Sequence, residues 1–509
     1  MKKIVGFVKK YWYFLFLVIP FTLICFVNTI PDNDTWFLLN SGRYVSQYGI
    51  PHIDPFSMHE GLHIIMHQWG SASIFYFFYN VFGYHGMIVL IWIMIALLFL
   101  VLYKLFYYCS KKKFISILGI ILVTLFCKYY IVLRPQVFTY IILFTEVYLL
   151  ERYAREDNVK YLYFLPILSF LQINLHGAMW LFQFVFLLPF IINAIPFKKI
   201  KFLKKLRIDK YRLKPLLVVA LVMILFGLIN PYGIEAFSFI YKSYGSSVVN
   251  SLVGEMFPPR FGEGAQGMAL FVFPMLVITL LFAVKKGKFD IRHILFILGC
   301  SLLAFMHNKC CPYFVIAVVY AVMYYIKDID FKFDFKILHN QIVVALSNAL
   351  KVVASLGLVA TFGCLLYYSY INYRFVTSDY LEDTYKYLKD NTDISKVTLF
   401  NNYEDGSYME FMGIKSYIDP RAEVFLKKHN GKDDILEEFV DVYKKPNGDF
   451  KSFINKYKFT HILVFDGEDF DDYLKTENDY KLVFEYKNTE TDEVVSRLYE
   501  RKDFNNLWK

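Results

Sequence analysis

Two carboxylates, Asp32 and Asp34, directly follow an apolar run at residues 11–30, and a third, Asp54, lies further along the same polar segment. A carboxylate beside a bilayer can take a proton from an acceptor hydroxyl, or it can hold a divalent cation such as Mg²⁺ or Mn²⁺ against a phosphate. These aspartates also have a structural interpretation, because Asp34 before Thr35 can cap a helix and Asp54 before Pro55 can start a turn. The residue types alone therefore leave catalysis, metal binding and local structure open.

Basic residues at the ends of apolar runs are the second group that could do chemistry. Arg134 and Lys309 have this position, and Arg260 lies in a segment between two such runs. A cation in or beside a bilayer is costly unless it is paired or functional. A guanidinium makes bidentate contacts with phosphate, so Arg134 is a candidate phosphate ligand, with Lys309 and Arg260 as further cations. Snorkelling of these side chains to lipid headgroups is the alternative.

Other polar residues of the same segments are candidate substrate contacts, each with a helix cap or a surface charge as its structural alternative: His67, Gln68, His176 and Glu255. Three loop histidines, His52, His59 and His63, are interpreted as solvated side chains. A histidine metal cluster is the alternative, although the ligand spacing is irregular for one.

The composition shows which kind of protein must position these residues. The 509 residues are 57% hydrophobic and 20% charged, whereas a soluble domain has about 45–50% apolar and about 25% charged residues. This excludes a disordered chain, a disulfide-rich secreted module and an ordinary cytosolic enzyme. The seven cysteines lie in or beside apolar runs without zinc or disulfide spacing. We therefore expect a polytopic membrane protein.

A helix needs about 20 apolar residues to cross a bilayer, and eleven runs are predicted to do so: 11–30, 85–108, 114–132, 136–151, 160–174, 177–196, 215–230, 267–284, 290–306, 311–326 and 346–371. The first run follows a basic start without a small-residue cleavage site, so we interpret it as a retained span rather than a signal peptide. With eleven spans, all six clusters of Lys and Arg fall on one side. Since cytoplasmic loops carry the excess of Lys and Arg, the N-terminus is expected in the cytoplasm and residues 373–509 outside the cell membrane.

Charge separates the predicted domains as well. Residues 373–509 carry 21 Lys and Arg against 29 Asp and Glu, whereas residues 1–372 carry 34 against 16. Nucleic-acid binding is not expected, because the basic residues form short clusters between apolar runs.

The segments expected on the outer face have their own predicted elements. In outer loop 1 (residues 31–84), segments 35–49 and 69–83 are expected to be helices at the membrane interface. In the tail, helices are predicted over 380–391 and 433–445, and strands over 396–402, 460–466, 480–486 and 494–501. This alternation predicts a small α/β domain.

A series of motifs runs in order along the chain: DNDTWFLLNSGRYVSQYGIPHIDPFS (32–57), HQWG (67–70), LRPQ (133–136), INLHG (173–177), INPYG (229–233), GEMFPP (254–259), NKCCPYF (308–314), NNYEDGSYMEF (401–411) and YIDPRAEVF (417–425). Together they resemble the GT-C superfamily of membrane glycosyltransferases, in particular a bacterial branch related to the protein-mannosyltransferase and aminoarabinose-transferase types.

The resemblance implies an all-α polytopic membrane domain over 1–372, with about 11 transmembrane helices and interfacial helices in outer loop 1, plus a small extracytoplasmic α/β domain over 373–509. It implies a polyprenyl-phosphate sugar as donor and an envelope glycan, lipid or protein as acceptor. An outer-loop acid acts as base in such enzymes, and it corresponds here to Asp34 or Asp32. Asp34 is the first choice, because it matches the aspartate before the family's tryptophan, and Asp32 is then its partner. The Asp32–Asp34 pair could hold a metal, although some members use none. Gln68 stands where the branch usually has glutamate, and Lys309 where it tends to have arginine.

Two other classes of protein are alternatives. A membrane transporter or flippase-like protein would place charges near the bilayer midplane and show related halves, whereas the charges of this sequence gather at the predicted outer rim. A non-catalytic envelope scaffold would use its tail to bind cell-wall polymer.

Overall fold

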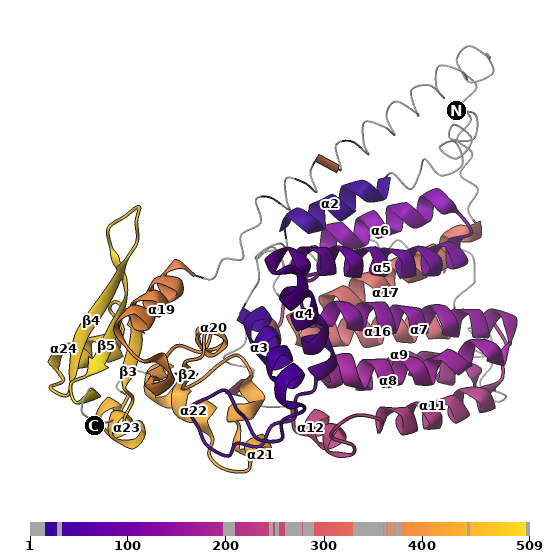
Figure 1. The fold of residues 1–509 in the computed structure, drawn as a ribbon. Helices are drawn as coiled ribbons and strands as arrows, with labels where there is room; N and C mark the ends of the chain where they lie inside the picture. Colours follow the sequence, from indigo (N-terminus) through magenta and orange to yellow (C-terminus); the bar gives the residue numbers. More distant parts are fainter. Residues whose placement is uncertain are drawn as a thin grey trace. The chain divides into compact units, whose positions relative to one another are not determined.

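The structure is a computed structural model of the chain, and it describes residues 16–27, 33–196, 209–243, 254–259, 290–328, 378–444 and 448–504, with a few isolated positions. The described chain is mostly helical with a small sheet near its C-terminus (Figure 1), as the sequence predicts. It divides into two compact units. Unit 1 comprises Met1–Thr29, Tyr84–Asn230 and Val253–Tyr373, and unit 2 comprises Ile30–Gly83, Pro231–Leu252 and Arg374–Lys509.

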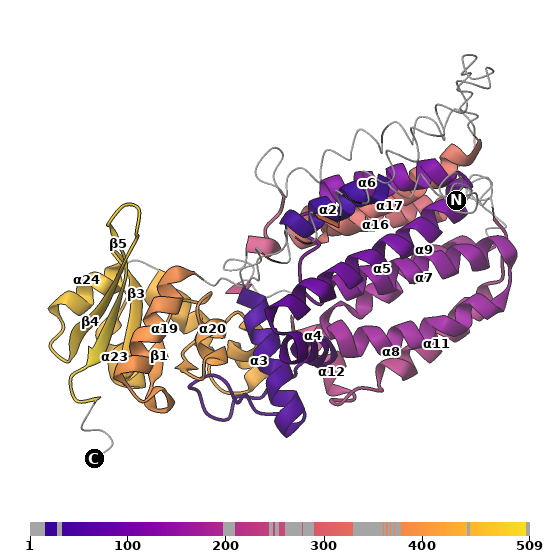
Figure 2. The ribbon, with the colours of Figure 1, turned by 45° about the horizontal axis from the view of Figure 1, so that its top comes forward.

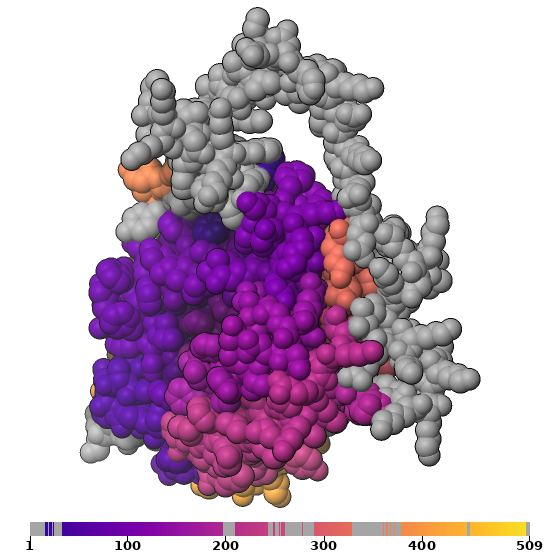
Figure 3. Space-filling model, turned by 90° about the vertical axis from the view of Figure 1, so that its right-hand side faces the viewer, coloured from indigo at the N-terminus to yellow at the C-terminus, as the bar shows by residue number. Residues whose placement is uncertain are grey.

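Unit 1 is a bundle of helices that run side by side (Figures 1 and 2) and that Figure 3 views from one end. The described helices are α2 (Val18–Val27), α5 (Tyr84–Ser110), α6 (Lys113–Cys127), α7 (Gln136–Glu156), α8 (Leu165–His176), α9 (Leu181–Ala194), α11 (Leu213–Gly227), α16 (Ile291–Met306) and α17 (Cys311–Tyr325). Short 3₁₀ turns η2 (Val159–Phe164), η3 (Gly177–Met179), η4 (Gly254–Met256), η6 (Asn308–Cys310) and η7 (Ile326–Asp328) flank them. Helix α5 packs against α6, α7 and α17, and α8 packs against α7 and α11.

The surface of unit 1 is apolar where its helices face outward. On α11, five large side chains are exposed over one stretch of the helix: Leu217, Val218, Leu221, Ile224 and Leu225. On α16, Leu298 and Leu302 are exposed in the same way. Several polar side chains are instead buried in the bundle, among them Thr139, Glu146 and Gln172. An apolar outside with polar groups inside is the arrangement expected of a bundle with lipid as its solvent.

The described residues contain fewer long apolar helices than the eleven predicted spans. By length and composition, two segments are long and apolar enough to cross a bilayer: Tyr84–Ser110 and Val159–Met179. Four other apolar helices, α6, α9, α11 and α16, have 14 to 16 residues. At a rise of about 1.5 Å per residue they fall short of a core about 30 Å thick. Helix α7 is longer but carries five charged residues over its last three turns: Glu146, Glu151, Arg152, Arg155 and Glu156.

The described residues therefore contain two helices that are long and apolar enough to span rather than eleven. Some predicted runs were themselves short, as for α16 and α17, and others end early as helices. The run predicted over 114–132, for example, is helical only to Cys127. The predicted span 267–284 lies outside the described residues apart from position 277, as does 346–371 apart from isolated positions.

The C-terminal part of unit 2 is the predicted α/β domain. Its five strands, β1 (Thr398–Phe400), β2 (Lys415–Ser416), β3 (His461–Phe465), β4 (Tyr480–Lys487) and β5 (Val494–Arg501), lie in the order β2-β1-β3-β5-β4. Strand β1 is parallel to β2 and β3, whereas β5 is antiparallel to β3 and β4. The four strands predicted from sequence are all confirmed, and β2 is an additional two-residue strand.

Helices α19 (Asp379–Asn391), α20 (Gly406–Phe411), α21 (Lys427–Asn430), α22 (Ile435–Phe439), α23 (Phe450–Tyr457) and α24 (Asp469–Thr476) accompany this sheet, with 3₁₀ turns η9 (Ile394–Lys396) and η10 (Ala422–Phe425) and the π-helical turn η11 (Val440–Lys444). The two predicted helices correspond to α19 and to α22 with η11. The core is aromatic, since the buried Phe400 ring contacts Tyr417, Phe453 and Phe470 at centroid distances of 5.6, 5.6 and 5.1 Å.

Outer loop 1 belongs to the same unit as this tail. Its two predicted helices are confirmed as α3 (Asn33–Tyr48) and α4 (Trp69–Phe82), and α12 (Glu235–Ser243) joins them from the middle of the chain. Helices α3 and α4 approach closely at Gly42, where an added Cβ would lie 2.1 Å from the Ala72 carbonyl oxygen. Trp36 of α3 packs against Tyr408 of α20 at 5.1 Å. Two segments that the sequence analysis assigned to different domains thus share one core.

Candidate functional site

Asp34 lies in the first turn of α3, half-buried, and the helix already begins at Asn33. It is therefore a first-turn acid and not the N-cap of the structural alternative. The tail fixes this helix start, because Asn33 Nδ2 donates to Glu404 Oε2 at 2.6 Å and Ser407 Oγ donates to the Asn33 carbonyl at 2.8 Å. Two segments that the sequence singled out, DNDTW and NNYEDGSYMEF, therefore meet at Asn33, next to Asp34. Its predicted partner Asp32 lies outside the described residues.

The surroundings of Asp34 are acidic. The nearby phenol of Tyr403 has a pKa raised well above its usual range, first by burial and then by the negative charges of Glu423 and Asp34. Asp419 and Glu404 raise the same pKa further, so several carboxylates surround this phenol.

The predicted substrate contact Asp54 has a structural role instead. Its buried carboxylate accepts from Arg421 Nη1 at 2.7 Å and from the Ser57 amide at 3.0 Å. Burial raises the pKa of Asp54, but Arg421 and Ser57 outweigh this and hold that pKa below its usual range. Arg421 also pairs with Asp419 and with Glu410, the latter at 3.3 Å. These pairs form a buried ion cluster that joins the 417–425 segment to outer loop 1.

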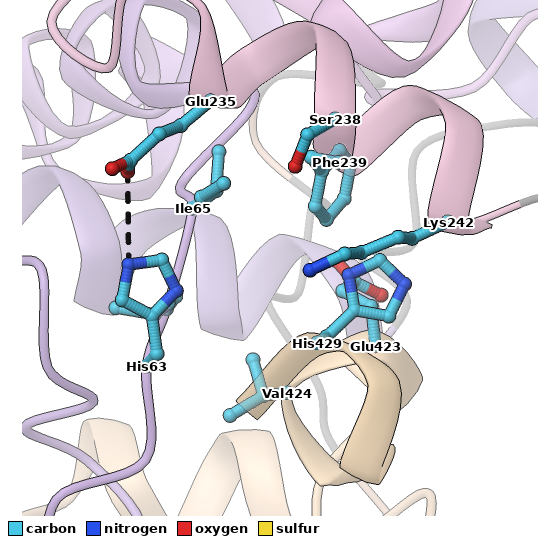
Figure 4. A pocket seen from close by; sticks show the side chains of 10 residues that line it. His63, Ile65, Glu235, Ser238, Phe239, Lys242, Glu423, Val424 and His429 are labelled. Carbon is cyan, nitrogen blue, oxygen red and sulfur yellow. Dashed lines mark ion pairs between the residues drawn. The ribbon is translucent and has the colours of Figure 1, made fainter. Parts of the chain in front are cut away.

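A polar pocket of about 220 Å³ lies within unit 2 (Figure 4). Its walls come from three segments, namely outer loop 1, α12 and the 423–429 region: His63, Ile64, Ile65, Glu235, Ser238, Phe239, Lys242, Glu423, Val424 and His429. The predicted contact His67 lies beside it, with Nδ1 3.6 Å from Glu423 Oε1 and its ring stacked on Phe239 at 4.8 Å. The neighbouring Gln68 precedes α4, and its carbonyl accepts from the Ala72 amide at 3.0 Å.

Burial shifts the pKa values of two side chains in this pocket, His429 and Glu423. Burial lowers the pKa of His429 to about 4 despite the nearby Glu423, so that its ring is neutral near pH 7. Burial raises the pKa of Glu423, which the histidine only partly offsets. Lys242 adds a cation to the lining. The pocket therefore offers a cation, hydroxyl and imidazole groups and a carboxylate, which together suit a hydroxyl-rich or anionic ligand.

Arg134 and Lys309, chosen from two separate motifs, line one small cavity of about 60 Å³ in unit 1. Their segments are joined by hydrogen bonds, because Gln136 Nε2 donates to the Lys309 carbonyl at 3.3 Å and Tyr130 Oη donates to Asn308 Oδ1 at 2.7 Å. Two cations and several polar groups around one cavity are suited to an anion such as phosphate.

The remaining predicted contacts have less definite positions. His176 ends α8, with Nδ1 2.8 Å from Thr139 Oγ1 and its carbonyl accepting from Gln172, as in the predicted helix-end role. Glu255 lies in the turn η4, whose neighbour Phe257 accepts from the Asn308 amide at 2.9 Å, so the GEMFPP and NKCCPYF motifs also meet. Arg260 lies outside the described residues.

Buried charges inside unit 1 are residues that the sequence analysis missed. Arg292 is fully buried and pairs with Glu151 at 3.1 Å, Asp290 at 2.8 Å and Asp209 at 2.6 Å. Glu146 is fully buried halfway along α7. The expectation that charges gather at the outer rim is therefore wrong. The signal was present in the sequence, because Glu146 and Glu151 interrupt or end a predicted apolar run.

Among the described residues, one set of potential metal ligands lies close together: His52, His63 and Glu235. The predicted pair Asp32–Asp34 is not part of it. No protein-family model matches the chain, and no curated protein sequence is significantly similar to it.

Proposed function

We propose that this chain is an integral-membrane glycosyltransferase of the GT-C type that moves a sugar from a polyprenyl-phosphate donor to an acceptor on the outer face of the cell membrane. The observation that supports this most directly is the cavity shared by Arg134 and Lys309. Each residue was selected as a phosphate contact from its own motif, and the fold brings them together although they are far apart in sequence.

The proposal includes a multi-pass membrane domain with the cytoplasmic N-terminus and extracytoplasmic tail inferred from the basic clusters. Exposed leucines on α11 and α16 support a lipid environment for unit 1. The helices of 14 to 16 residues would then span by tilting little and thinning the bilayer locally.

The reaction needs a base and a phosphate-binding group. The acceptor hydroxyl oxygen attacks the anomeric carbon, the bond from that carbon to the phosphate oxygen breaks, and polyprenyl phosphate leaves with the bonding electrons. Asp34 takes the hydroxyl proton, and Arg134 and Lys309 bind the phosphate and stabilise the charge it gains. The polar pocket around His67, Lys242 and Glu423 binds hydroxyl groups of a substrate.

Mass spectrometry of envelope glycans and glycolipids, from cells with and without this chain, tests the proposal. A sugar that is lost without the chain, and that returns with the wild-type chain but not with Asp34→Asn, supports it. An unchanged set of envelope glycans contradicts it. Robust transfer from a nucleotide sugar without a lipid carrier would contradict the choice of donor.

A transporter or flippase-like protein is the second candidate, and the buried Glu146 favours it. An ionisable side chain midway along an intramembrane helix is often part of a transport pathway. Glu146→Gln separates the two functions, because a transferase keeps its transfer activity in this variant whereas a transporter loses coupled movement of its substrate.

A further inference from the structure

We propose that His52, His63 and Glu235 form a binding site for a zinc ion on unit 2. One ligand atom from each of the three side chains lies within 4.8 Å of the other two, and His63 Nε2 is already 3.7 Å from Glu235 Oε2. The inference goes beyond the proposed glycosyltransferase, because it concerns neither the Asp32–Asp34 pair nor the phosphate cations, and it does not depend on any sugar substrate.

The backbone holds the two histidines in a fixed relationship. Residues Ile53 and His63 form an antiparallel bridge, flanked by hydrogen bonds from the Ile64 amide to the His52 carbonyl at 3.1 Å and from the Asp54 amide to the Leu62 carbonyl at 2.8 Å. Asp54 is in turn anchored by the buried Arg421. The loop that carries the histidines is therefore closed by a short hairpin and tied to the interior of unit 2.

Tyr232 brings the third ligand to this hairpin. Its hydroxyl donates to the Pro51 carbonyl at 2.9 Å and accepts from the Met66 amide at 3.0 Å, so it bridges the two ends of the loop. Its ring also packs edge-on against the His52 imidazole at 5.2 Å. Glu235 begins α12 one turn later, and its amide donates to the Tyr232 carbonyl at 3.0 Å. The hydrogen bonds of Tyr232 thus hold together the two segments that carry the three ligands, although these segments are far apart in the chain.

The chemistry of the three ligands favours zinc. Two imidazoles and one carboxylate are a common zinc set, with Zn–N distances of about 2.0–2.1 Å and tetrahedral ligand atoms therefore about 3.3 Å apart. Small rotations of the three side chains would bring their ligand atoms, now within 4.8 Å of one another, to the spacing of a tetrahedral site. Magnesium and calcium prefer all-oxygen ligands, and manganese binds such nitrogen sites more weakly.

An ion at this place would have an open coordination position. Three protein ligands leave the fourth tetrahedral position to water or to a ligand. His63 and Glu235 also line the polar pocket, so the open position would lie at the margin of that pocket, on the side away from Glu423 and His429 (Figure 4). A zinc ion here would add positive charge to a pocket that already holds Lys242.

Direct measurement of bound zinc tests the site. The full chain, purified in detergent through a tag without histidine and stripped by a chelator, is dialysed against buffered Zn²⁺ and its metal content is measured. We expect one zinc ion per chain, lost or weakened by at least about 10-fold in His52→Gln/His63→Gln and in Glu235→Gln. Cobalt should give the absorption of a tetrahedral complex with two nitrogen ligands in the wild type only.

The control variant is His307→Gln, which removes a histidine of unit 1 and should leave zinc binding unchanged. Size-exclusion chromatography and circular dichroism establish that each variant keeps its fold. Zinc binding that is absent from the wild type, or equally strong in His52→Gln/His63→Gln and in Glu235→Gln, would overturn the proposal. Because zinc content is read without any transfer assay, this test and the test of the glycosyltransferase can fail independently.

Discussion

Arg421 Nη1 donates a 2.7 Å hydrogen bond to Asp54 Oδ1 and so joins two residues that are 367 positions apart in the chain. Both side chains are buried, and Asp419 and Glu410 complete the surroundings of the guanidinium. Outer loop 1 and the C-terminal domain therefore form one folding unit through a buried ion cluster.

Removing the cation of this cluster should severely destabilise unit 2. Arg421→Met leaves three buried carboxylates without their partner, and such a loss typically costs about 3–5 kcal/mol. We expect a clear drop in the thermal unfolding midpoint of the detergent-solubilised chain. Lys396→Met is the matched control, since it removes a cation that pairs with Asp393 at the surface and should leave the midpoint nearly unchanged. Equal midpoints for both variants would show that the cluster is not structural.

A methyl group at Gly42 should disturb the packing of α3 on α4. Its Cβ would lie 2.1 Å from the Ala72 carbonyl oxygen and 2.6 Å from Tyr76 Cβ, and overpacking of this kind costs about 1–3 kcal/mol. Gly299→Ala in α16 is the control, because a Cβ there meets no atom within 4 Å and alanine favours the helix. Thermal unfolding should therefore show a loss for Gly42→Ala and none for Gly299→Ala.

Local patterns in the sequence were sufficient for much of unit 2. Strands β3, β4 and β5 and helices α3, α4 and α19 follow from periodicity and turn residues, because these depend on neighbours in the chain. The pairing of Asp54 with Arg421 could not be predicted, since nothing local relates residues that far apart. The same holds for the approach of Glu235 to His63.

The candidate site shows the same limit. Arg134 and Lys309 were identified separately by their residue type at the end of an apolar run, and only the fold shows that they share a cavity. Span prediction failed differently, because hydropathy counts apolar residues and does not detect the turn that ends α6 at Cys127. Hydropathy also does not predict that a charged side chain such as Glu151 is buried, because the cost of its burial is offset by the ion pair with Arg292.

Binding of a lipid phosphate should depend on both cations of the small cavity. Arg134→Gln and Lys309→Gln each remove a charge-assisted contact worth about 1.5–3 kcal/mol, which corresponds to a loss of affinity of about 10- to 100-fold. Lys309→Arg should preserve binding, because it keeps the charge. The measurement is native mass spectrometry or fluorescence titration with a short-chain polyprenyl phosphate.

Lys128→Gln is the matched control for this cavity. Lys128 lies over the Tyr129 ring at 4.7 Å in the same connecting segment but does not line the cavity. Its loss should leave the affinity unchanged. If all three glutamine variants weakened binding equally, the attraction would be a general effect of charge.

Acid should weaken the sheet of unit 2 through His461. This ring is fully buried on β3, with Nδ1 3.1 Å from Thr460 Oγ1, and burial lowers its pKa to about 4 although Glu500 opposes the shift. In the unfolded chain the pKa is about 6.5. Between these values the unfolded chain binds a proton that the folded one does not, so stability falls as the pH drops from about 6.5 to about 4, by at most about 3 kcal/mol.

Hydrogen exchange of the β3 peptide, corrected for the intrinsic effect of pH, measures this loss. His461→Gln removes the titrating ring, so its stability should depend less steeply on pH over the same range than that of the wild type. The comparison isolates His461, because the other buried acids titrate in both proteins. Parallel pH profiles would contradict the assignment.

Asp34 provides the most direct test of catalysis. Asp34→Asn keeps the size and polarity of the side chain but removes the base, and loss of a positioned base typically lowers the rate by about 10²–10⁴-fold. The structural cost is small by comparison, since a first-turn acid contributes about 0.3–1 kcal/mol through the helix dipole. We therefore expect normal insertion and folding with most transfer activity lost, measured by restoration of the envelope glycan and by thermal unfolding.

The matched control is Asp379→Asn, because Asp379 is likewise a first-turn acid, at the start of α19. It should produce a similarly small change in stability and no loss of transfer. Asp34→Glu adds a further distinction, since a base that must be positioned tolerates an extra methylene poorly whereas a dipole interaction tolerates it well. If Asp34→Asn kept near-wild-type turnover and behaved like Asp379→Asn, Asp34 would serve only to stabilise the start of α3. The base would then have to be another acid near Tyr403. Glu423 would be the first candidate, because its charge also raises the pKa of Tyr403.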